Sequence, residues 1–138
     1  MNLTFKAHSV NESFARITVA AFISQLDPTL NELTDIKTVV SEAVTNCIVH
    51  GYRNSVGKIY IGVKIHDDNR VIITIRDRGC GISDIKKARE PLFTTLGGDR
   101  AGLGFSVMES FSDKLRVRSK VGVGTTVTME KRICGKTK

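Results

Sequence analysis

The 138-residue chain has no tryptophan and no hydrophobic run of the length that crosses a bilayer. A membrane-spanning helix needs about 20 predominantly apolar residues, so we expect no membrane contact and a cytoplasmic location. Cysteine is also sparse, and Cys47, Cys80 and Cys134 form no Cys-x-x-Cys pair. Their spacing argues against a zinc site and against a disulfide framework. We therefore expect free thiols in one domain over residues 1–138, a length that suits a single compact core.

Acidic residues are scarce relative to basic ones, and the formal net charge is +7. Such a balance suggests nucleic acid as a partner. The Lys and Arg residues are nevertheless scattered along the sequence apart from a cluster near its end, and no pattern interleaves them with aromatic residues. The sequence therefore predicts no direct contact with nucleic acid. A solvated basic surface is the simplest interpretation, and such a surface also suits an acidic protein or a polyphosphate.

Hydrophobic periodicity changes several times along the chain and predicts a mixture of helices and strands. Helices are expected at 11–25, from Thr29 to about His50, at 85–89 and at 103–111, and strands at 3–7, 59–65, 71–76, 115–119 and 125–131. Thr29 and Glu32 match a capping box, and Gly51 is placed to end that helix. The combination predicts an α+β fold, a two-layer sandwich in which helices cover one face of a mixed, mostly antiparallel sheet.

The two long helices each have a candidate core-facing side. In the helix that starts after Thr29, apolar residues follow one another at helical spacing: Leu33, Ile36, Val40, Ala43, Val44 and Cys47. In the helix at 11–25, the apolar side is predicted to contain Phe14, Ile17, Ala21 and Phe22.

Glu42, Asn46 and His50 are four residues apart, so they line one face of the predicted helix, away from its apolar side. The amide oxygen of Asn46 is a suitable ligand for Mg²⁺, and the carboxylate of Glu42 is able to accept a proton from an attacking hydroxyl. A solvated polar face explains the same spacing. Spacing alone favours the solvated face and leaves a catalytic pair as the alternative.

Two glycine-containing segments are candidates for ligand contacts. In the segment 77–81, Asp77 is suited to accept a hydrogen bond from an exocyclic amine such as adenine N6, and its glycines permit a close backbone approach. The segment 97–105 leads into a predicted helix, where free N–H groups bind phosphate, and Arg100 is suited to contact a terminal phosphate. This segment matches neither a Walker A loop nor the loop of ordinary protein kinases. Each segment alone is equally explained as a surface turn.

The order of these segments is more specific than any one of them. Glu-x-x-x-Asn on a helix, Asp-x-Gly-x-Gly after a strand, Gly-x-Gly before a helix and Gly124-Thr125 on a late strand resemble the four boxes of the GHKL superfamily, whose ATP-binding domain is called the Bergerat fold. The stretches 11–16, 38–52 and 91–95 are further similar to the anti-sigma-factor serine kinases. The resemblance covers nearly the whole chain.

The resemblance implies a role for each matching residue. Glu42 would be the general base and Asn46 the Mg²⁺ ligand, Asp77 would contact adenine, and Arg100 would lie near the γ-phosphate of ATP. The nucleotide contacts implied by the resemblance are Asn46, His50, Gly51, Asp77, Gly79, Gly81, Ile82, Thr94, Thr95, Gly102, Leu103, Gly104 and Thr125. Arg16 matches a position that contacts protein partners in the family.

The function implied by the resemblance is that of an ATP- and Mg²⁺-dependent protein serine kinase that is also an anti-sigma factor. As a homodimer it would inhibit the sporulation sigma factor F and phosphorylate the corresponding anti-anti-sigma factor. Two alternatives stay open: a kinase of the stress-response sigma-B type, and an ATP-gated sigma-binding module without kinase activity. A histidine-kinase fragment is less favoured, because no helix carries a phosphoacceptor histidine.

Overall fold

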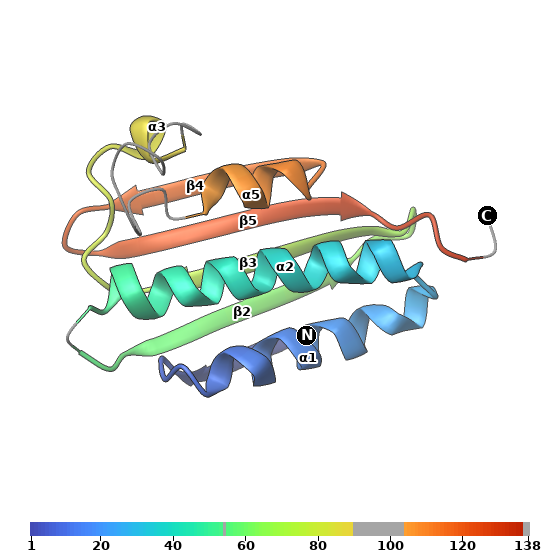
Figure 1. Cartoon of the computed structure of the whole chain (residues 1–138), viewed down its shortest axis with the longest axis horizontal. Coiled ribbons are helices and arrows are strands. Elements are labelled where there is room, and N and C mark those ends of the chain that lie inside the picture. Colours follow the sequence, from blue (N-terminus) through green and yellow to red (C-terminus); the bar gives the residue numbers. More distant parts are fainter. Residues whose placement is uncertain (54, 90–103, 137–138) are drawn as a thin grey trace.

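The computed structural model describes residues 1–53, 55–89 and 104–136, which form a sheet with helices packed on one of its faces (Figure 1). The strands are β1 (Asn2–Lys6), β2 (Lys58–Ile65), β3 (Arg70–Asp77), β4 (Lys114–Lys120) and β5 (Gly124–Arg132). The helices are α1 (Asn11–Ile23), α2 (Leu30–Asn46), α3 (Ile85–Ala88) and α5 (Phe105–Ser110). This order and the two-layer α+β architecture confirm the predictions from hydrophobic periodicity.

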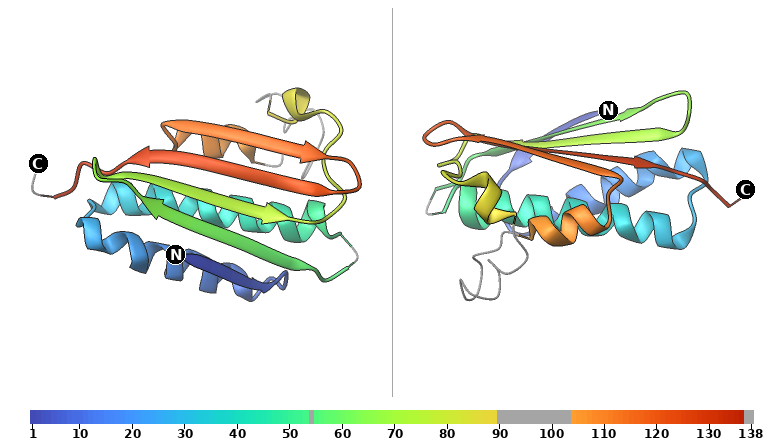
Figure 2. Two further views of the ribbon diagram at one scale, coloured as in Figure 1. Left: turned by 180° about the vertical axis from the view of Figure 1, so that it is seen from behind. Right: turned by 90° about the horizontal axis from the view of Figure 1, so that it is seen from above.

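The sheet has the strand order β1-β2-β3-β5-β4, and all four pairings between described strands are antiparallel. The sequence predicted a mixed sheet, but no parallel pair occurs among these strands. The alternating strand residues Ile59, Ile61 and Val63 are buried, because successive side chains of a strand point to opposite faces. The helices cover the face to which these side chains point, and the opposite face has no described element over it (Figure 2).

Helix α1 packs beside α2, but through a different side from the one predicted. Ala15, Val19 and Ile23 are fully buried. The residues predicted to face the core are instead exposed or only half-buried: Phe14, Ile17, Ala21 and Phe22. Apolar residues occur around most of the circumference of this helix, so their spacing did not distinguish the buried side.

Helix α2 begins at the predicted capping box. The Glu32 amide donates to Thr29 Oγ1 at 3.1 Å, and the Thr29 amide donates to Glu32 Oε1 at 2.9 Å, which satisfies two otherwise unpaired donors. The predicted core-facing residues Ile36, Val40, Ala43, Val44 and Cys47 are buried, while Leu33 is half-buried.

The predicted end of this helix, about His50, is also confirmed, but its last turn is wider than an α-turn. Residues Cys47–Gly51 form the π-helical turn η2, and the Tyr52 amide donates to the Cys47 carbonyl at 2.9 Å. A π turn re-aims the side chains at a helix end and is frequent at functional sites. No helix within the described ranges is long and apolar enough to span a membrane.

Candidate functional site

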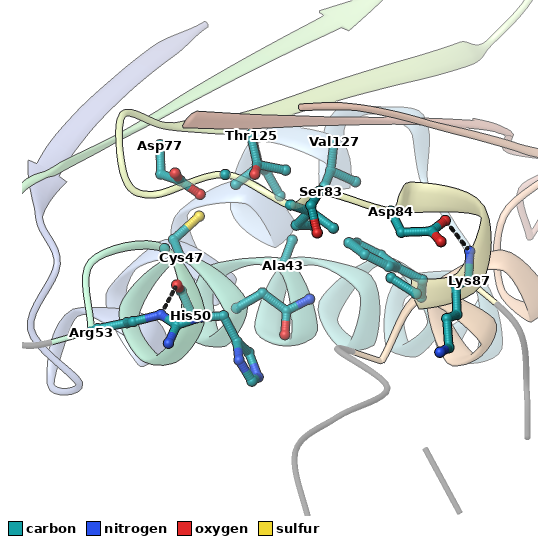
Figure 3. A pocket seen from close by; sticks show the side chains of 17 residues that line it. Ala43, Cys47, His50, Arg53, Asp77, Ser83, Asp84, Lys87, Thr125 and Val127 are labelled. Carbon is teal, nitrogen blue, oxygen red and sulfur yellow. Dashed lines mark hydrogen bonds between the residues drawn. The ribbon is translucent and has the colours of Figure 1, made fainter. Parts of the chain in front are cut away.

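A cavity of about 460 Å³ lies between the two layers, at the end of α2 that carries the π turn (Figure 3). Its walls come from α2 and η2, the ends of β3 and β5, the loop after β3, α3 and the first residue of α5. Cavities of a few hundred Å³ with a few polar groups are typical of small-molecule sites. Asn46, His50, Gly51, Asp77, Gly81, Ile82 and Thr125, which were singled out in the sequence, all line it.

Asp77 is the one charged side chain among the buried residues of the described ranges, with 4% of its surface exposed. Burial raises the pKa of its carboxyl above the ordinary value of 3.8, while hydrogen bonds from the Gly79 amide, the Cys47 thiol and the Thr125 amide act in the opposite direction. The Gly79 amide donates to Asp77 Oδ1 at 2.8 Å. A carboxylate held by donors and not by a cation retains acceptor capacity for a ligand amine.

Cys47 is a residue of this site that sequence reasoning missed. Its sulfur points toward the Asp77 carboxylate (Figure 3), and the thiol donates a hydrogen bond to it. Burial, followed by the adjacent Asp77 charge, raises the pKa of the thiol well above its ordinary value, so the thiol stays protonated. The sequence showed Cys47 only as part of the apolar side of α2, and no local signal connects it with a carboxylate 30 positions later.

Glycines allow the loop after β3 to lie against the π turn. A Cβ atom on Gly79 would be 2.1 Å from the Gly51 carbonyl oxygen, and one on Gly51 would be 2.9 Å from the Asp77 carboxyl carbon. The Cys80 amide donates to the same Gly51 carbonyl at 2.9 Å. These contacts hold the loop after β3 against η2, and a side chain at either glycine would push the two segments apart.

The hydroxyl of Thr125 is positioned by Ser119, a second residue that the sequence analysis did not single out. Their oxygen atoms are 2.8 Å apart, and Ser119 Oγ accepts a hydrogen bond from the Ile82 amide at 2.7 Å. Ser119 therefore joins the β4–β5 hairpin to the loop after β3 at the edge of the cavity.

Glu42 lies one turn before Asn46 on α2 and outside the lining of the large cavity. A Cβ atom on Gly104 would be 3.0 Å from the Glu42 carboxyl carbon, so Glu42 lies against the start of α5. Glu42 also borders a second hollow, of about 380 Å³, together with Arg16. In this hollow Arg16 pairs with Glu12 at 3.2 Å, and Ser41 donates to Glu12 at 2.6 Å.

The structure thus brings the predicted base and the predicted partner-binding residue, Glu42 and Arg16, to one surface. Five predicted contacts, Thr94, Thr95, Arg100, Gly102 and Leu103, lie outside the described residues. Gly104 is described, and it starts α5 with a φ of 69°, a conformation that glycine adopts without strain.

Comparisons with known proteins identify the fold and the family of the chain. Residues 5–131 match the family model of the histidine kinase-like ATPase domain. The catalytic domain of the histidine kinase ThkA superposes with a TM-score of 0.59 at 18% identity over 96% of each chain. A histidine kinase domain from Erythrobacter litoralis superposes with a TM-score of 0.59 at 19% identity, over 88% of this chain and 60% of its own. The chain belongs to the histidine kinase-like ATPase family, a class of ATP-binding domains.

Relatives with higher sequence identity define a narrower family within that class. The anti-sigma F factor of Priestia megaterium is 56% identical over 135 residues, covering 96% of this chain and 92% of its own. The anti-sigma F factors of Geobacillus stearothermophilus and Bacillus subtilis are also 56% identical, covering 99% and 96% of this chain and 94% and 92% of their own. The chain therefore belongs to the anti-sigma F factor family.

Proposed function

We propose that this protein binds and inhibits sporulation sigma factor F and phosphorylates a serine of the cognate anti-anti-sigma factor with Mg·ATP. The observation that carries the proposal is that Glu42 borders the hollow that contains Arg16 and lies one helical turn from Asn46, which lines the cavity that suits a nucleotide. A base in this position is able to reach a hydroxyl that a partner protein presents beside the bound nucleotide.

Different residues of the cavity would contact different parts of the nucleotide. Asp77 would accept a hydrogen bond from the adenine amino group, and Thr125, its partner across the β3–β5 pair, would support the same end of the cavity. Asn46 at the end of α2 and His50 in η2 line the cavity wall. A nucleotide held in this way would extend its phosphates toward the start of α5, against which Glu42 lies.

The donor set fits Mg²⁺. In the part of the chain that the structure describes, no group of three His, Cys, Asp or Glu side chains forms a metal cluster. Mg²⁺ in nucleotide sites typically takes one or two protein oxygen ligands and completes its coordination with phosphates and water. The Asn46 amide oxygen would be such a ligand, and the ion when bound would neutralise charge that develops on the phosphates.

In the phosphotransfer step, Glu42 accepts the proton of the partner's serine hydroxyl. The serine oxygen forms a bond to the γ-phosphorus as the bond between that phosphorus and the β–γ bridging oxygen breaks, which releases ADP. Positioning and electrostatic stabilisation supply most of the rate enhancement in such reactions.

The first experiment is a phosphotransfer assay with Mg·ATP and the purified anti-anti-sigma partner. The native chain is expected to phosphorylate one serine, whereas Glu42→Gln keeps ATP binding and loses at least about a hundredfold in rate, the usual contribution of a general base. Asp77→Asn is the companion variant and is expected to lose ATP affinity itself. Equal rates for the native chain and Glu42→Gln would remove Glu42 from the mechanism.

The two alternatives differ in the result of parallel measurements. ATP-dependent capture of sigma factor F without any serine phosphorylation would leave an ATP-gated binding module. Preference for a stress-response sigma factor over sigma factor F in the same capture assay would place the chain with the sigma-B type. Arg16→Ala is expected to weaken capture of the protein partners with no change in ATP affinity.

A further inference from the structure

The uncovered face of the sheet carries an unusual concentration of positive charge. Strand alternation and pairing register place ten Lys and Arg side chains on this face, away from the helices, and we call it the outer face. The ten are Lys6, Lys58, Lys64, Arg70, Arg76, Lys114, Arg116, Arg118, Lys120 and Arg132. Glu130 is the one carboxylate among the same strand positions, and it pairs with Arg70 at 3.7 Å.

This distribution accounts for the net charge of the whole protein. The outer face holds ten of the 21 Lys and Arg residues but one of the 14 Asp and Glu residues, which leaves eleven basic and thirteen acidic residues elsewhere. The remainder of the chain is therefore slightly acidic. In the linear sequence the cations are scattered, but strand pairing gathers ten of them from all five strands on one face.

The polar character of the outer face restricts the kind of partner. Between the cations lie threonines, including Thr74, Thr126 and Thr128, and Ile72 is the one aliphatic side chain larger than alanine at the outward strand positions. Protein interfaces have an apolar centre that is depleted in lysine, and membrane-binding surfaces need apolar anchors. Interfaces with nucleic acid are by contrast polar and strongly positive.

The single aromatic residue of the outer face, Tyr60, already has two guanidinium groups beside its ring. The Arg76 and Arg78 guanidinium carbons lie 5.0 and 5.1 Å from the centre of the Tyr60 ring. Single-stranded nucleic acids bind mainly to uncovered aromatic rings along a groove. The outer face instead spreads its cations in two dimensions, about 7 Å apart along a strand and about 5 Å between strands.

We propose that the outer face binds the phosphate backbone of double-stranded DNA without sequence preference. A duplex carries one negative charge per about 1.7 Å of its axis, so it presents phosphates to several strands of the sheet at once. Next to the β4–β5 turn, Arg76, Arg78, Arg118 and Lys120 border a hollow of about 390 Å³, which Asp77 and Thr125 border as well. The arginines there offer a phosphate several guanidinium donors.

This activity lies beyond the proposed kinase and anti-sigma function, and it uses the opposite side of the sheet. The ATP cavity lies between the sheet and the helices (Figure 3), whereas the outer face is on the other side (Figure 2). Nucleotide and DNA are therefore expected to bind together, which would keep the protein on the chromosome.

The test is a fluorescence anisotropy titration of the full chain with a labelled DNA duplex of mixed sequence, repeated over a series of salt concentrations. At physiological salt we expect a Kd on the order of 10⁻⁶ to 10⁻⁴ M, with tighter binding at lower salt and equal affinity for unrelated sequences. The variant Lys114→Gln/Arg116→Gln/Arg118→Gln is expected to bind at least about tenfold more weakly. Its plot of log Kd against log salt concentration should lose about 2 to 3 units of slope, since each phosphate contact contributes about 0.9.

The matched control is Lys37→Gln/Lys86→Gln/Lys136→Gln, which removes the same charge from positions outside the outer face. Unchanged melting temperature and ATP affinity show that each variant is folded. Equal weakening in both variants would mean attraction by net charge alone and would overturn the proposal. Absence of duplex binding at low salt would also overturn it, as would stronger binding to single-stranded DNA or to a polyglutamate peptide.

Discussion

The Asp77 carboxyl is buried, and the groups around it determine how readily it becomes protonated as the pH falls. Three donors, from Gly79, Cys47 and Thr125, oppose the rise in pKa that burial causes. In the role that we propose for Asp77, its carboxyl must be ionised to accept a strong hydrogen bond from the adenine amino group. ATP affinity is therefore expected to decline on the acid side of neutrality, as Asp77 takes up a proton in the free protein.

Cys47→Ala is expected to move this decline to higher pH, because it removes one of the donors that lower the Asp77 pKa. At neutral pH the ATP affinity should change by less than about tenfold, the range that one neutral hydrogen bond covers. Isothermal titration with ATP across the acid range measures both effects. Cys80→Ala is the control, because the Cys80 sulfur contacts the His50 carbonyl at 3.1 Å and not Asp77. If ATP affinity declined over the same acid pH range in both variants, this role of Cys47 would be contradicted.

At the scale of elements, α2 is held at its start by more than its own capping box. Glu32 also accepts from the Cys134 and Gly135 amides at 2.7 and 3.1 Å, which attaches the segment after β5 to the first turn of α2. Burial alone would raise the Glu32 pKa, but the hydrogen bonds from Thr29, Cys134 and Gly135 lower it below the ordinary value of 4.5. The ionised carboxylate therefore stabilises the fold.

Glu32→Ala is expected to lower the free energy of unfolding by about 1 to 2 kcal/mol at neutral pH, as the loss of a helix cap typically does. A lowered pKa contributes stability above the unfolded-state pKa, and this contribution disappears as pH falls through the folded-state value. The difference between native chain and variant should thus shrink in strong acid. Urea unfolding at several pH values measures it, and a difference independent of pH would show that the carboxylate charge plays no part.

The limits of prediction from sequence are also clearest for these elements. The start of α2 was predictable, because Thr29 and Glu32 form a local motif whose hydrogen bonds do not depend on the rest of the fold. The buried side of α1 was not predictable. Phe14 and Ala15 each belong to an apolar stripe of this helix, and only packing against neighbouring elements determines which stripe is buried. The Cys47–Asp77 pair and the outer face depend on how strands and helices meet in space, which residue spacing along the chain does not contain.

At the scale of the whole molecule, the predicted homodimer stays a proposal. Support comes from the start of α1, where the N-cap residue Val10 and the helix residues Phe14 and Ile17 are 75%, 47% and 60% exposed. They form an apolar surface beside the edge strand β1, whose Phe5 contacts Phe14. A second copy of the chain is the occupant that we propose for it, since paired copies would bury the same residues from both sides.

Ile17→Glu is expected to convert the dimer to a monomer, because each interface would then bury two unpaired carboxylates. Sedimentation velocity at micromolar concentration measures the change in mass. Val121→Glu is the control, as Val121 is a similarly exposed apolar residue, 63% exposed, on the turn before β5. A native chain that sediments as a monomer would contradict the proposal, as would a dimer that survives Ile17→Glu.

The alternation of side chains across the sheet has a consequence for how this family diversifies. Residues that point toward the helices are constrained by the core and the ATP cavity, whereas the outward residues of the same strands touch neither. Substitution at one set therefore leaves the other almost undisturbed. Two members of the family are able to retain the same catalytic apparatus and yet acquire surfaces of opposite charge, so the cellular surroundings of the enzyme can evolve independently of its chemistry.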